Sequence, residues 1–405
     1  MFEDHQKTAY LLKCMMDNMS DMIYFKDRDS KIIMINKACA EWQGHCSPEE
    51  MVGKSDSDFY SKKDAARMRE EELHIMQTGE PLCGVEESET WKNGTHAWVS
   101  STKMPLRDAA GDIIGIFGIS RDITEHKESE ILAAKYAEEN RRFREEIEDD
   151  LLMASQLQKT FFPTSYPTFS AADQSGDELI QFSHLHRAGG LMGGDLCSIR
   201  KLSDDEVGIF LCDVMGHGVR AALGTSIVRA MLEEISDQEK DPGRFLERMN
   251  QILMPLFRQE DLFMYATACY MVLRVSTGEV MFANAGHPSP FHLDIRRGYA
   301  EPLMDERSLC GPGLAIEESA VYTTINRRIQ PGDTIFMYTD GVTEVLNRDA
   351  EEYGETRLMD SARGKINLPM AVLFEALYKD ACSFSAHGSV EDDVCFVGFR
   401  LSDKA

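Results

Sequence analysis

The chain has 405 residues, too many for one ordinary hydrophobic core, which predicts two domains and a connector. Its formal net charge of −26 argues against nucleic acid or an anionic membrane surface as a general partner. The acidic start does not resemble a secretory signal, and the longest apolar stretch, residues 263–273, is too short to span a bilayer. The 10 cysteines form no C-x-x-C pair, which argues against a zinc site or a disulfide framework. We therefore expect a soluble, cytoplasmic protein.

Residues 1–124 alternate strand-like and helical segments. Two strands surround a polar turn in MIYFKDRDSKIIMINKA, and a short helix is predicted from Lys37 onward. A longer helix over SKKDAARMREEELHIMQTG ends at Gly79, and Pro81 follows two residues later. Three more strands are predicted at residues 84–91, 95–105 and 113–119.

The order of these elements, closed by RDITEHKE, carries a family resemblance. Two strands, helices and three antiparallel strands resemble a PAS domain, and WKNGTHAWVSSTKMPLRDAAGDIIGIFGISRDIT contributes most of the likeness. The resemblance implies an α/β sensor domain over residues 1–124 that takes a small ligand or dimerises. Trp42, Trp91 and Trp98 would line its pocket or form plain core. His74 fits a surface position better than a haem ligand, so the PAS ligand stays unknown.

Residues 125–162 are rich in charge and lack glycine and proline, which predicts one long helix. Apolar side chains recur along it at spacings of mostly three and four, at Leu132, Tyr136, Phe143, Ile147, Leu151, Ala154, Leu157 and Phe161. A short parallel coiled coil would bury this stripe in a homodimer, with Asn140 in the seam to fix its register. The alternative is a helix that packs only on its own domain.

Acidic residues stand at the ends of apolar strand patterns in four places of the remaining chain. Asp195 closes GGLMGGD, Asp213 ends VGIFLCD and Asp340 ends TIFMYTD, while Asp392 and Asp393 precede VCFVGFRL. Each aspartate alone suits a turn or a helix cap. Together they are costly to bury unless they are paired or bind metal, and no matching set of Lys or Arg accompanies them. Converging carboxylates are the ligands that Mg²⁺ or Mn²⁺ prefers.

The ordered set of motifs is more specific than any one of them. GGD, then DVMGHG, NAGHPSP, PGDTIFMYTDGVTE and a final DD resemble the PPM-type (protein phosphatase 2C-like) phosphatases in their SpoIIE/RsbU branch. The segment DLLMASQLQKTFFP is similar to the helix that leads into their catalytic domain. The resemblance implies an α+β fold with an αββα sandwich over residues 163–405 and two Mn²⁺ or Mg²⁺ ions. It also implies that metal-activated water hydrolyses phosphoserine or phosphothreonine on a partner protein.

The resemblance assigns roles to individual residues. Metal ligands are implied at Asp195, Asp213, the Val214 carbonyl, Asp340, Asp392 and, ranked lower, Asp393. Asp213 would bridge both ions, Asp195 would bind one of them directly or through water, and Asp340 would hold the second with Asp392. The NAGHPSP motif, with Asn284, Gly286 and His287, is implied to be structural.

Two departures from the family pattern concern the substrate. Where relatives place a histidine proposed as general acid, this chain has Met215, and His217 follows two residues later. His217 is therefore a candidate acid, with a plain helix N-terminus as the alternative. No arginine clearly matches the phosphate-binding arginine of those relatives, so docking would depend on the partner. By resemblance the partner is a phosphorylated STAS-domain anti-anti-sigma factor, and a PAS rearrangement would pass along residues 125–162 to the segment near Asp195 or Asp213.

Three competing functions follow from parts of the same sequence. The first is a catalytically weak binding or scaffold module that keeps the fold. The second is a PAS histidine kinase with His126 as phosphoacceptor, although no ATP-binding motif follows. The third is a nucleotide cyclase of the GGDEF type, but here LC follows GGD in place of EF.

Overall fold

The computed structural model describes residues 2–44, 47–170, 178–236, 238–304 and 310–402. Its contacts divide the chain into two compact units, Met1–Arg144 and Glu145–Ala405, which we describe separately. None of the helices in these described ranges combines the length and the apolar character that crossing a membrane requires.

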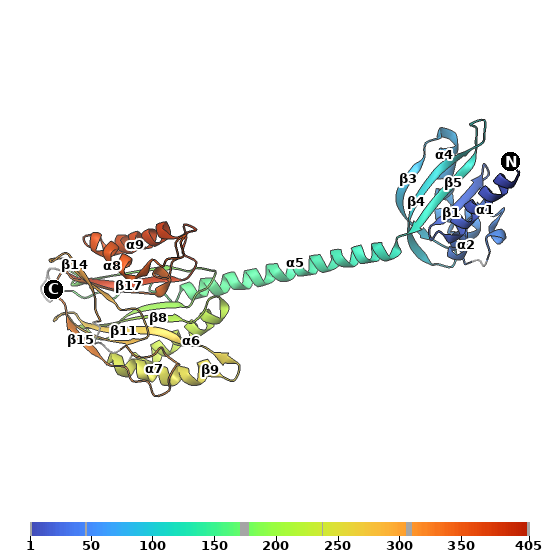
Figure 1. Cartoon of the computed structure of the whole chain (residues 1–405). Helices are drawn as coiled ribbons and strands as arrows, with labels where there is room; N and C mark the ends of the chain where they lie inside the picture. The colour runs from blue at the N-terminus through green and yellow to red at the C-terminus, as the bar shows by residue number, and fades with distance from the viewer. Residues whose placement is uncertain (1, 45–46, 171–177, 237, 305–309, 403–405) are drawn as a thin grey trace. The chain divides into compact units, whose positions relative to one another are not determined.

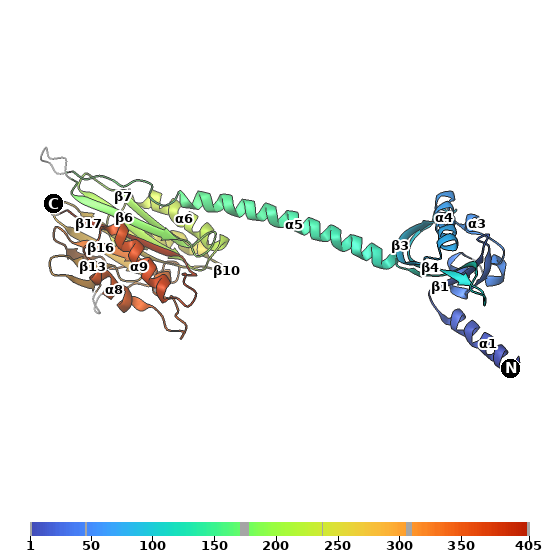
Figure 2. The same ribbon diagram turned by 90° about the horizontal axis from the view of Figure 1, so that it is seen from above.

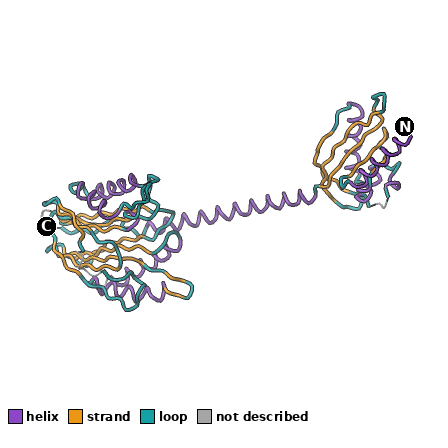
Figure 3. The backbone as a smooth tube through the Cα atoms, viewed as in Figure 1, coloured by secondary structure: helices purple, strands orange, loops and turns teal. Residues whose placement is uncertain are grey.

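The first unit is built on one antiparallel sheet with the strand order β2-β1-β5-β4-β3 (Figure 3). Its strands are β1 Met22–Asp27, β2 Ile32–Ile35, β3 Leu82–Thr90, β4 His96–Arg107 and β5 Ile113–Asp122. Its helices are α1 Phe2–Asn18, α2 Lys37–Trp42, the short 3-10 helix η1 Pro48–Met51, α3 Asp56–Phe59 and α4 Lys62–Thr78. The predicted short helix and all five predicted strands are confirmed to within a few residues, whereas α1 was not predicted.

The ends of α4 follow from its sequence. The Ser61 hydroxyl accepts a hydrogen bond from the Asp64 amide at 3.2 Å, which caps the first turn. Gly79 adopts φ 74°, the left-handed conformation that ends a helix at little cost for glycine. The predicted helix over 61–79 is thus confirmed, and α4 lies where it can present buried Glu72 to the interior of the unit.

A single helix, α5 Thr124–Lys159, covers nearly all of the predicted helical segment 125–162. The apolar side chains of its middle part, including Tyr136, Phe143 and Ile147, are exposed. Only its last turns are buried, at Ser155 and Gln158. The helix therefore packs on the second unit at its end, and its apolar stripe has no cover in the described chain. The predicted domain boundaries at 124 and 162 stay predictions.

The second unit has two five-stranded antiparallel sheets, with strand orders β15-β12-β11-β8-β7 and β14-β13-β16-β17-β6. The first sheet comprises β7 Asp195–Lys201, β8 Glu206–Val214, β11 Ala266–Arg274, β12 Glu279–Ala285 and β15 Ile325–Arg328. The second comprises β6 Ile180–Arg187, β13 Phe291–Asp294, β14 Tyr299–Pro302, β16 Thr334–Tyr338 and β17 Val394–Leu401. A small ribbon is formed by β9 Arg258–Gln259 and β10 Leu262–Phe263.

Helices cover the outer face of each sheet, which completes four layers (Figures 1 and 2). They are α6 Val219–Ile235 and α7 Pro242–Phe257 on the first sheet, and α8 Gly354–Gly364 and α9 Met370–Phe384 on the second, with the 3-10 turn η2 Asp340–Val342 after β16. Between the sheets, Leu211 of β8 packs in one apolar core with Met337 of β16 and Val397 of β17. The predicted αββα sandwich is confirmed, and both sheets are buried on two faces.

Candidate metal centre

The predicted acidic residues lie at the ends of paired strands. Asp195 at the start of β7 and Asp213 near the end of β8 are direct partners in the antiparallel register of the first sheet. In the second sheet β16 pairs with β17, so Asp340 just after β16 and Asp392 just before β17 belong to neighbouring strand ends. Each sheet thus contributes a pair of carboxylates from adjacent antiparallel strands.

Thr339 joins the two carboxylate pairs across the sandwich. Its hydroxyl donates a hydrogen bond to Asp195 Oδ2 at 2.9 Å and accepts one from the backbone N–H of Cys395 at 2.8 Å. Both bonds are buried, so they hold the ends of β7, β16 and β17 in one place. The threonine beside Asp340 therefore positions Asp195 from the opposite sheet.

Asp393 is used by the backbone of the glycine-rich loop. Its two carboxylate oxygens accept hydrogen bonds from the backbone N–H groups of Gly189 at 2.9 Å and Gly194 at 2.6 Å. A Cβ atom on Gly193 would lie 2.0 Å from Asp393 Oδ2, so this close approach requires glycine. Neighbouring Asp392 is exposed instead. Both oxygens of Asp393 are therefore already used by backbone N–H groups, and its lower rank as a ligand stays a prediction.

The carboxylates raise one another's pKa because they share a buried region. Burial first, and then Asp213 and Asp393, raise the pKa of Asp195 well above its ordinary value. Burial, followed by Asp340 and Asp392, raises the pKa of Asp213 to about 7. The pKa of Asp340 is raised by burial and by Asp392. Such mutual repulsion is typical of carboxylates that share a binding site for a cation.

The residues present fit a hard divalent cation in their chemistry. Asp195 Oδ1 is buried and has no hydrogen-bond partner, so one ligand oxygen remains available. Among the described residues, no three His, Cys, Asp or Glu side chains already lie close enough to share an ion. The oxygen ligands that such an ion needs are therefore present at one end of the sandwich. Their side chains are not close enough to one another to coordinate one ion together.

Val214 ends β8, and Met215 and His217 lie on the turn that leads from this strand to α6. Val214 is fully buried, and the backbone N–H of Met215 donates to the Tyr265 carbonyl at 2.9 Å. His217 is exposed and lines two grooves of about 650 and 310 Å³, which also share Asp392. The candidate acid thus borders the same open space as one candidate ligand.

The NAGHPSP segment forms a closed, buried turn. The Asn284 side chain donates to the His287 carbonyl and accepts from the His287 backbone N–H, both at 2.8 Å. Thr267 Oγ1 lies 2.8 Å from His287 Nδ1, and burial lowers the pKa of this histidine to about 3. These contacts agree with the structural role that the sequence implied.

Gln158 is a site-supporting residue that the sequence analysis missed. From the last turn of α5, its Nε2 donates to the Gly193 carbonyl at 2.6 Å, and the Gly193 backbone N–H donates to its Oε1 at 3.1 Å. The amide side chain is buried and therefore holds the loop next to Asp195 at both a donor and an acceptor. The helix motif containing Gln158 was recognised, but no signal distinguished this glutamine from its neighbours.

Two family models match the chain. Residues 203–402 match the model for stage II sporulation protein E (SpoIIE), and residues 16–128 match the model described as PAS fold. The chain carries a PAS domain followed by a SpoIIE-type PPM phosphatase domain. The SpoIIE match contains Asp213, Asp340 and Asp392, while Asp195 lies just before it.

Known proteins resemble this PAS–SpoIIE chain at low identity. It is 23% identical over 257 residues to the phosphoserine phosphatase RsbP of Bacillus subtilis, covering 63% of this chain and 59% of that protein. It is 23% identical over 204 residues to the phosphoserine phosphatase RsbU of the same organism, covering 50% of this chain and 56% of that one. The chain thus spans little more than half the length of these relatives.

A solved structure supports the fold of the second unit. The SiaA-PP2C domain of Pseudomonas aeruginosa superposes with a TM-score of 0.52 at 22% identity, covering 64% of this chain and 98% of that one. At this identity the likeness establishes the sandwich architecture, whereas chemistry must be argued from the residues of the PAS–SpoIIE chain itself.

Proposed function

We propose that this chain is a cytoplasmic, metal-dependent protein serine/threonine phosphatase. The observation that carries the proposal is that Asp195 pairs directly with Asp213 in one sheet and is hydrogen-bonded by Thr339, next to Asp340, from the other. Neighbouring carboxylates raise the pKa of all three aspartates. Carboxylates crowded in this way are stabilised by a divalent cation of the Mg²⁺ or Mn²⁺ class. The SpoIIE-type family of the domain and the names of its relatives point to phosphoserine or phosphothreonine as the substrate.

The residues that would hold two ions are those implied by the sequence. Asp213 would contact both, with Asp195 and the Val214 carbonyl on one side and Asp340 and Asp392 on the other. Bound ions of this kind lower the pKa of a water molecule and neutralise phosphoryl oxygens. The chain's own part is to keep these carboxylates fixed, through Thr339 and the strand register, and to leave the neighbouring groove open to a protein substrate.

A covalent cysteine mechanism is disfavoured by the surroundings of the thiols. Cys212 and Cys395 adjoin the carboxylates, but both are fully buried. Burial and the nearby acidic groups raise the pKa of the Cys212 thiol well above its ordinary value. A protonated, buried thiol is a poor nucleophile, which leaves activated water as the attacking group.

A phosphorylated STAS-domain protein is the proposed partner, and its turnover is the test of the function. When Mn²⁺ is added, the full chain is expected to release phosphate from a phosphoserine STAS protein and from p-nitrophenyl phosphate. Phosphate release should stop when a chelator removes the Mn²⁺. Release from p-nitrophenyl phosphate alone would support the phosphatase and contradict the STAS partner. If neither substrate reacts with any divalent metal, the chain acts as the scaffold module instead.

His217 is proposed to protonate the leaving serine oxygen. We expect His217→Ala to lower kcat on the phosphoserine protein by about 10²-fold, because a positioned acid contributes at least that much. Activity on p-nitrophenyl phosphate should stay near the wild-type value, since nitrophenolate leaves without a proton. His387→Ala is the matched control, because His387 lines the same groove. Equal loss on both substrates would assign His217 to binding or folding.

The exposed stripe of α5 is proposed to form the seam of a homodimer that couples the PAS domain to the phosphatase domain. Ile147→Pro should break the helix at a cost of about 3 kcal/mol. We expect this variant to sediment as a monomer and to hydrolyse substrate at the rate of residues 145–405 alone. Glu148→Ala, on the same turn, should keep the wild-type mass and rate. A dimeric Ile147→Pro chain would contradict the seam.

A further inference from the structure

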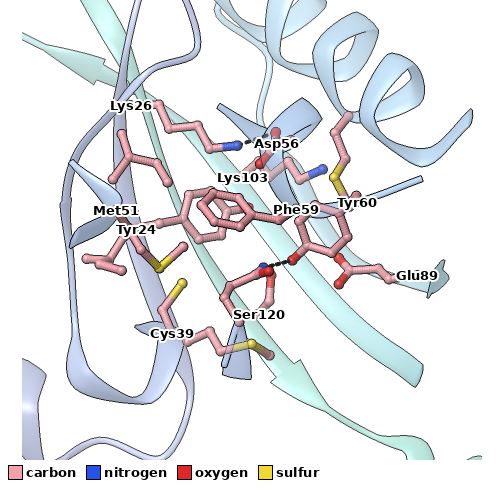
Figure 4. A pocket seen from close by; sticks show the side chains of 15 residues that line it. Tyr24, Lys26, Cys39, Met51, Asp56, Phe59, Tyr60, Glu89, Lys103 and Ser120 are labelled. Carbon is pink, nitrogen blue, oxygen red and sulfur yellow. Dashed lines mark hydrogen bonds and ion pairs between the residues drawn. The ribbon is translucent and has the colours of Figure 1, made fainter. Parts of the chain in front are cut away.

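The PAS domain has a small cavity with both apolar and charged walls between its sheet and the helices α2 to α4 (Figure 4). Its volume is about 40 Å³, which gives room for roughly three water molecules. Charged and polar side chains that line it include Lys26, Asp56, Tyr60, Glu89, Lys103 and Ser120. A cavity of this size takes a molecule of a few heavy atoms, and the charged lining indicates that such a molecule is polar.

Both lysines of the cavity are already paired. Lys26 Nζ lies 2.5 Å from Asp56 Oδ2 and 2.5 Å from Glu72 Oε1. Burial alone would lower the pKa of Lys26, but these two carboxylates raise it above its ordinary value, so the ammonium group stays charged. Such pairing satisfies the cation and leaves little attraction for an anionic ligand.

Lys103 is held in the same way. Its Nζ lies 2.5 Å from Glu71 Oε2 and 3.7 Å from Glu87 Oε1. Arg67 pairs with the same two glutamates, so the three cations Lys26, Lys103 and Arg67 are surrounded by four carboxylates, those of Asp56, Glu71, Glu72 and Glu87, before Glu89 is considered. This balance disfavours a carboxylate or phosphate ligand and favours a cation.

Glu89 differs from the other acids because it forms no ion pair within the described part of the PAS domain. Only 5% of the residue is exposed, and Figure 4 shows its carboxylate beside the Tyr60 ring at the cavity wall. The Tyr60 hydroxyl accepts a hydrogen bond from the Gln43 amide, which leaves the tyrosine proton free to face Glu89. Burial raises the pKa of Glu89 to about 7, and the charge of Lys103 offsets this effect only in part.

We propose that this cavity binds a small cation with N–H donors, of the primary amine or ammonium class, whose charge is paired by Glu89. The amine would supply the direct ion pair that Glu89 lacks, and its N–H groups would find acceptors in Glu89 and the Ser120 hydroxyl. Binding is independent of the proposed phosphatase function, whereas any effect of the amine on the rate rests on that function.

The strand that carries Glu89 also contacts the start of α5. Glu86, on the same strand β3, forms an ion pair of 2.7 Å with Lys127 in the first turns of the helix. The Thr124 hydroxyl at the helix start accepts a hydrogen bond from the Trp98 backbone N–H on β4 at 2.9 Å. Movement of β3 when Glu89 gains a partner would therefore reach the helix through the Glu86–Lys127 contact.

The test uses the full chain without phosphatase substrate. Methylammonium chloride should raise the melting temperature of the PAS transition and bind in isothermal titration. Tetramethylammonium, which is larger and has no N–H, and sodium acetate at the same ionic strength should do neither. Stabilisation by acetate, or equal stabilisation by tetramethylammonium, would overturn the proposal. Measurements on the wild-type chain are enough to show either result.

Variants locate the site. Glu89→Gln keeps the shape of the side chain and should weaken methylammonium binding about tenfold or more, because a charge-assisted hydrogen bond is lost. Glu80→Gln should keep the wild-type affinity, since Glu80 is exposed and does not line the cavity. Unchanged affinity in Glu89→Gln would overturn the assignment. Binding without any change in phosphate release would leave the site standing and contradict only its regulatory role.

Discussion

Replacing Asp213 with asparagine is expected to lower metal-dependent phosphate release by on the order of 10²–10³-fold, the usual cost of removing one group that stabilises transition-state charge. Asp213 is the direct register partner of Asp195, and its carboxylate is the one that the proposed function places on both ions. Asparagine keeps the size of the side chain but removes the charge. The measurement is phosphate release at saturating Mn²⁺ with the phosphoserine protein.

The same variant is expected to be more stable than the wild type when metal is removed. Because the pKa of Asp213 is raised to about 7 from 3.8, the folded metal-free chain keeps a proton that the unfolded chain releases. Stability of the wild type should therefore fall as pH rises from about 4 to 7 and stay low above that. Asp213→Asn lacks this penalty, so at pH 8 in chelator it should melt at a higher temperature than the wild type.

Asp204→Asn is the matched control for both measurements. Asp204 lies on the turn at the opposite end of the β7–β8 hairpin, and its side chain is fully exposed. This variant should keep both the rate and the melting temperature of the wild type. An Asp213→Asn chain that is inactive and also less stable than the wild type would indicate a folding defect and contradict a ligand role.

The strand-end aspartates were predictable because buried strands have a plain signature. VGIFLCD and TIFMYTD are continuous apolar runs, which indicate strands covered on both faces, and each ends in an acid. What the sequence could not provide was the pairing of Asp195 with Asp213 in register, or the hydrogen bond from Thr339 that links the sheets. Those depend on which strands are neighbours.

The polar interior of the PAS domain was not predictable for the same reason. Lys26 lies in a strand and Glu72 in a helix 46 residues later, and each sequence context resembles an ordinary solvated face. The tryptophans were expected to line a pocket or to form core. In the structure Trp42 and Trp91 pack edge to face with ring centroids 5.1 Å apart, and neither lines the cavity.

Gln158→Ala is expected to lower phosphatase activity about 10–100-fold and to raise the Mn²⁺ concentration for half-maximal rate, as is typical when the support of a metal ligand is lost. The buried amide holds both the N–H and the carbonyl of Gly193, two residues before Asp195. Without it the loop keeps its hydrogen bonds at Gly189, Met192 and Gly194, but Gly193 loses both of its bonds to the amide, so Asp195 is positioned less firmly.

Gln156 offers a control on the same helical turn, since it carries the same side chain and is exposed. Gln156→Ala should leave both the rate and the Mn²⁺ dependence unchanged. A Mn²⁺ titration of Gln158→Ala distinguishes a role in positioning Asp195 from a general loss of stability. If Gln158 positions Asp195, high Mn²⁺ should restore part of the lost rate in Gln158→Ala, because binding energy can offset a less ordered loop. A rate that falls without any change in Mn²⁺ dependence would contradict this role and with it the proposed path from α5 to the metal centre.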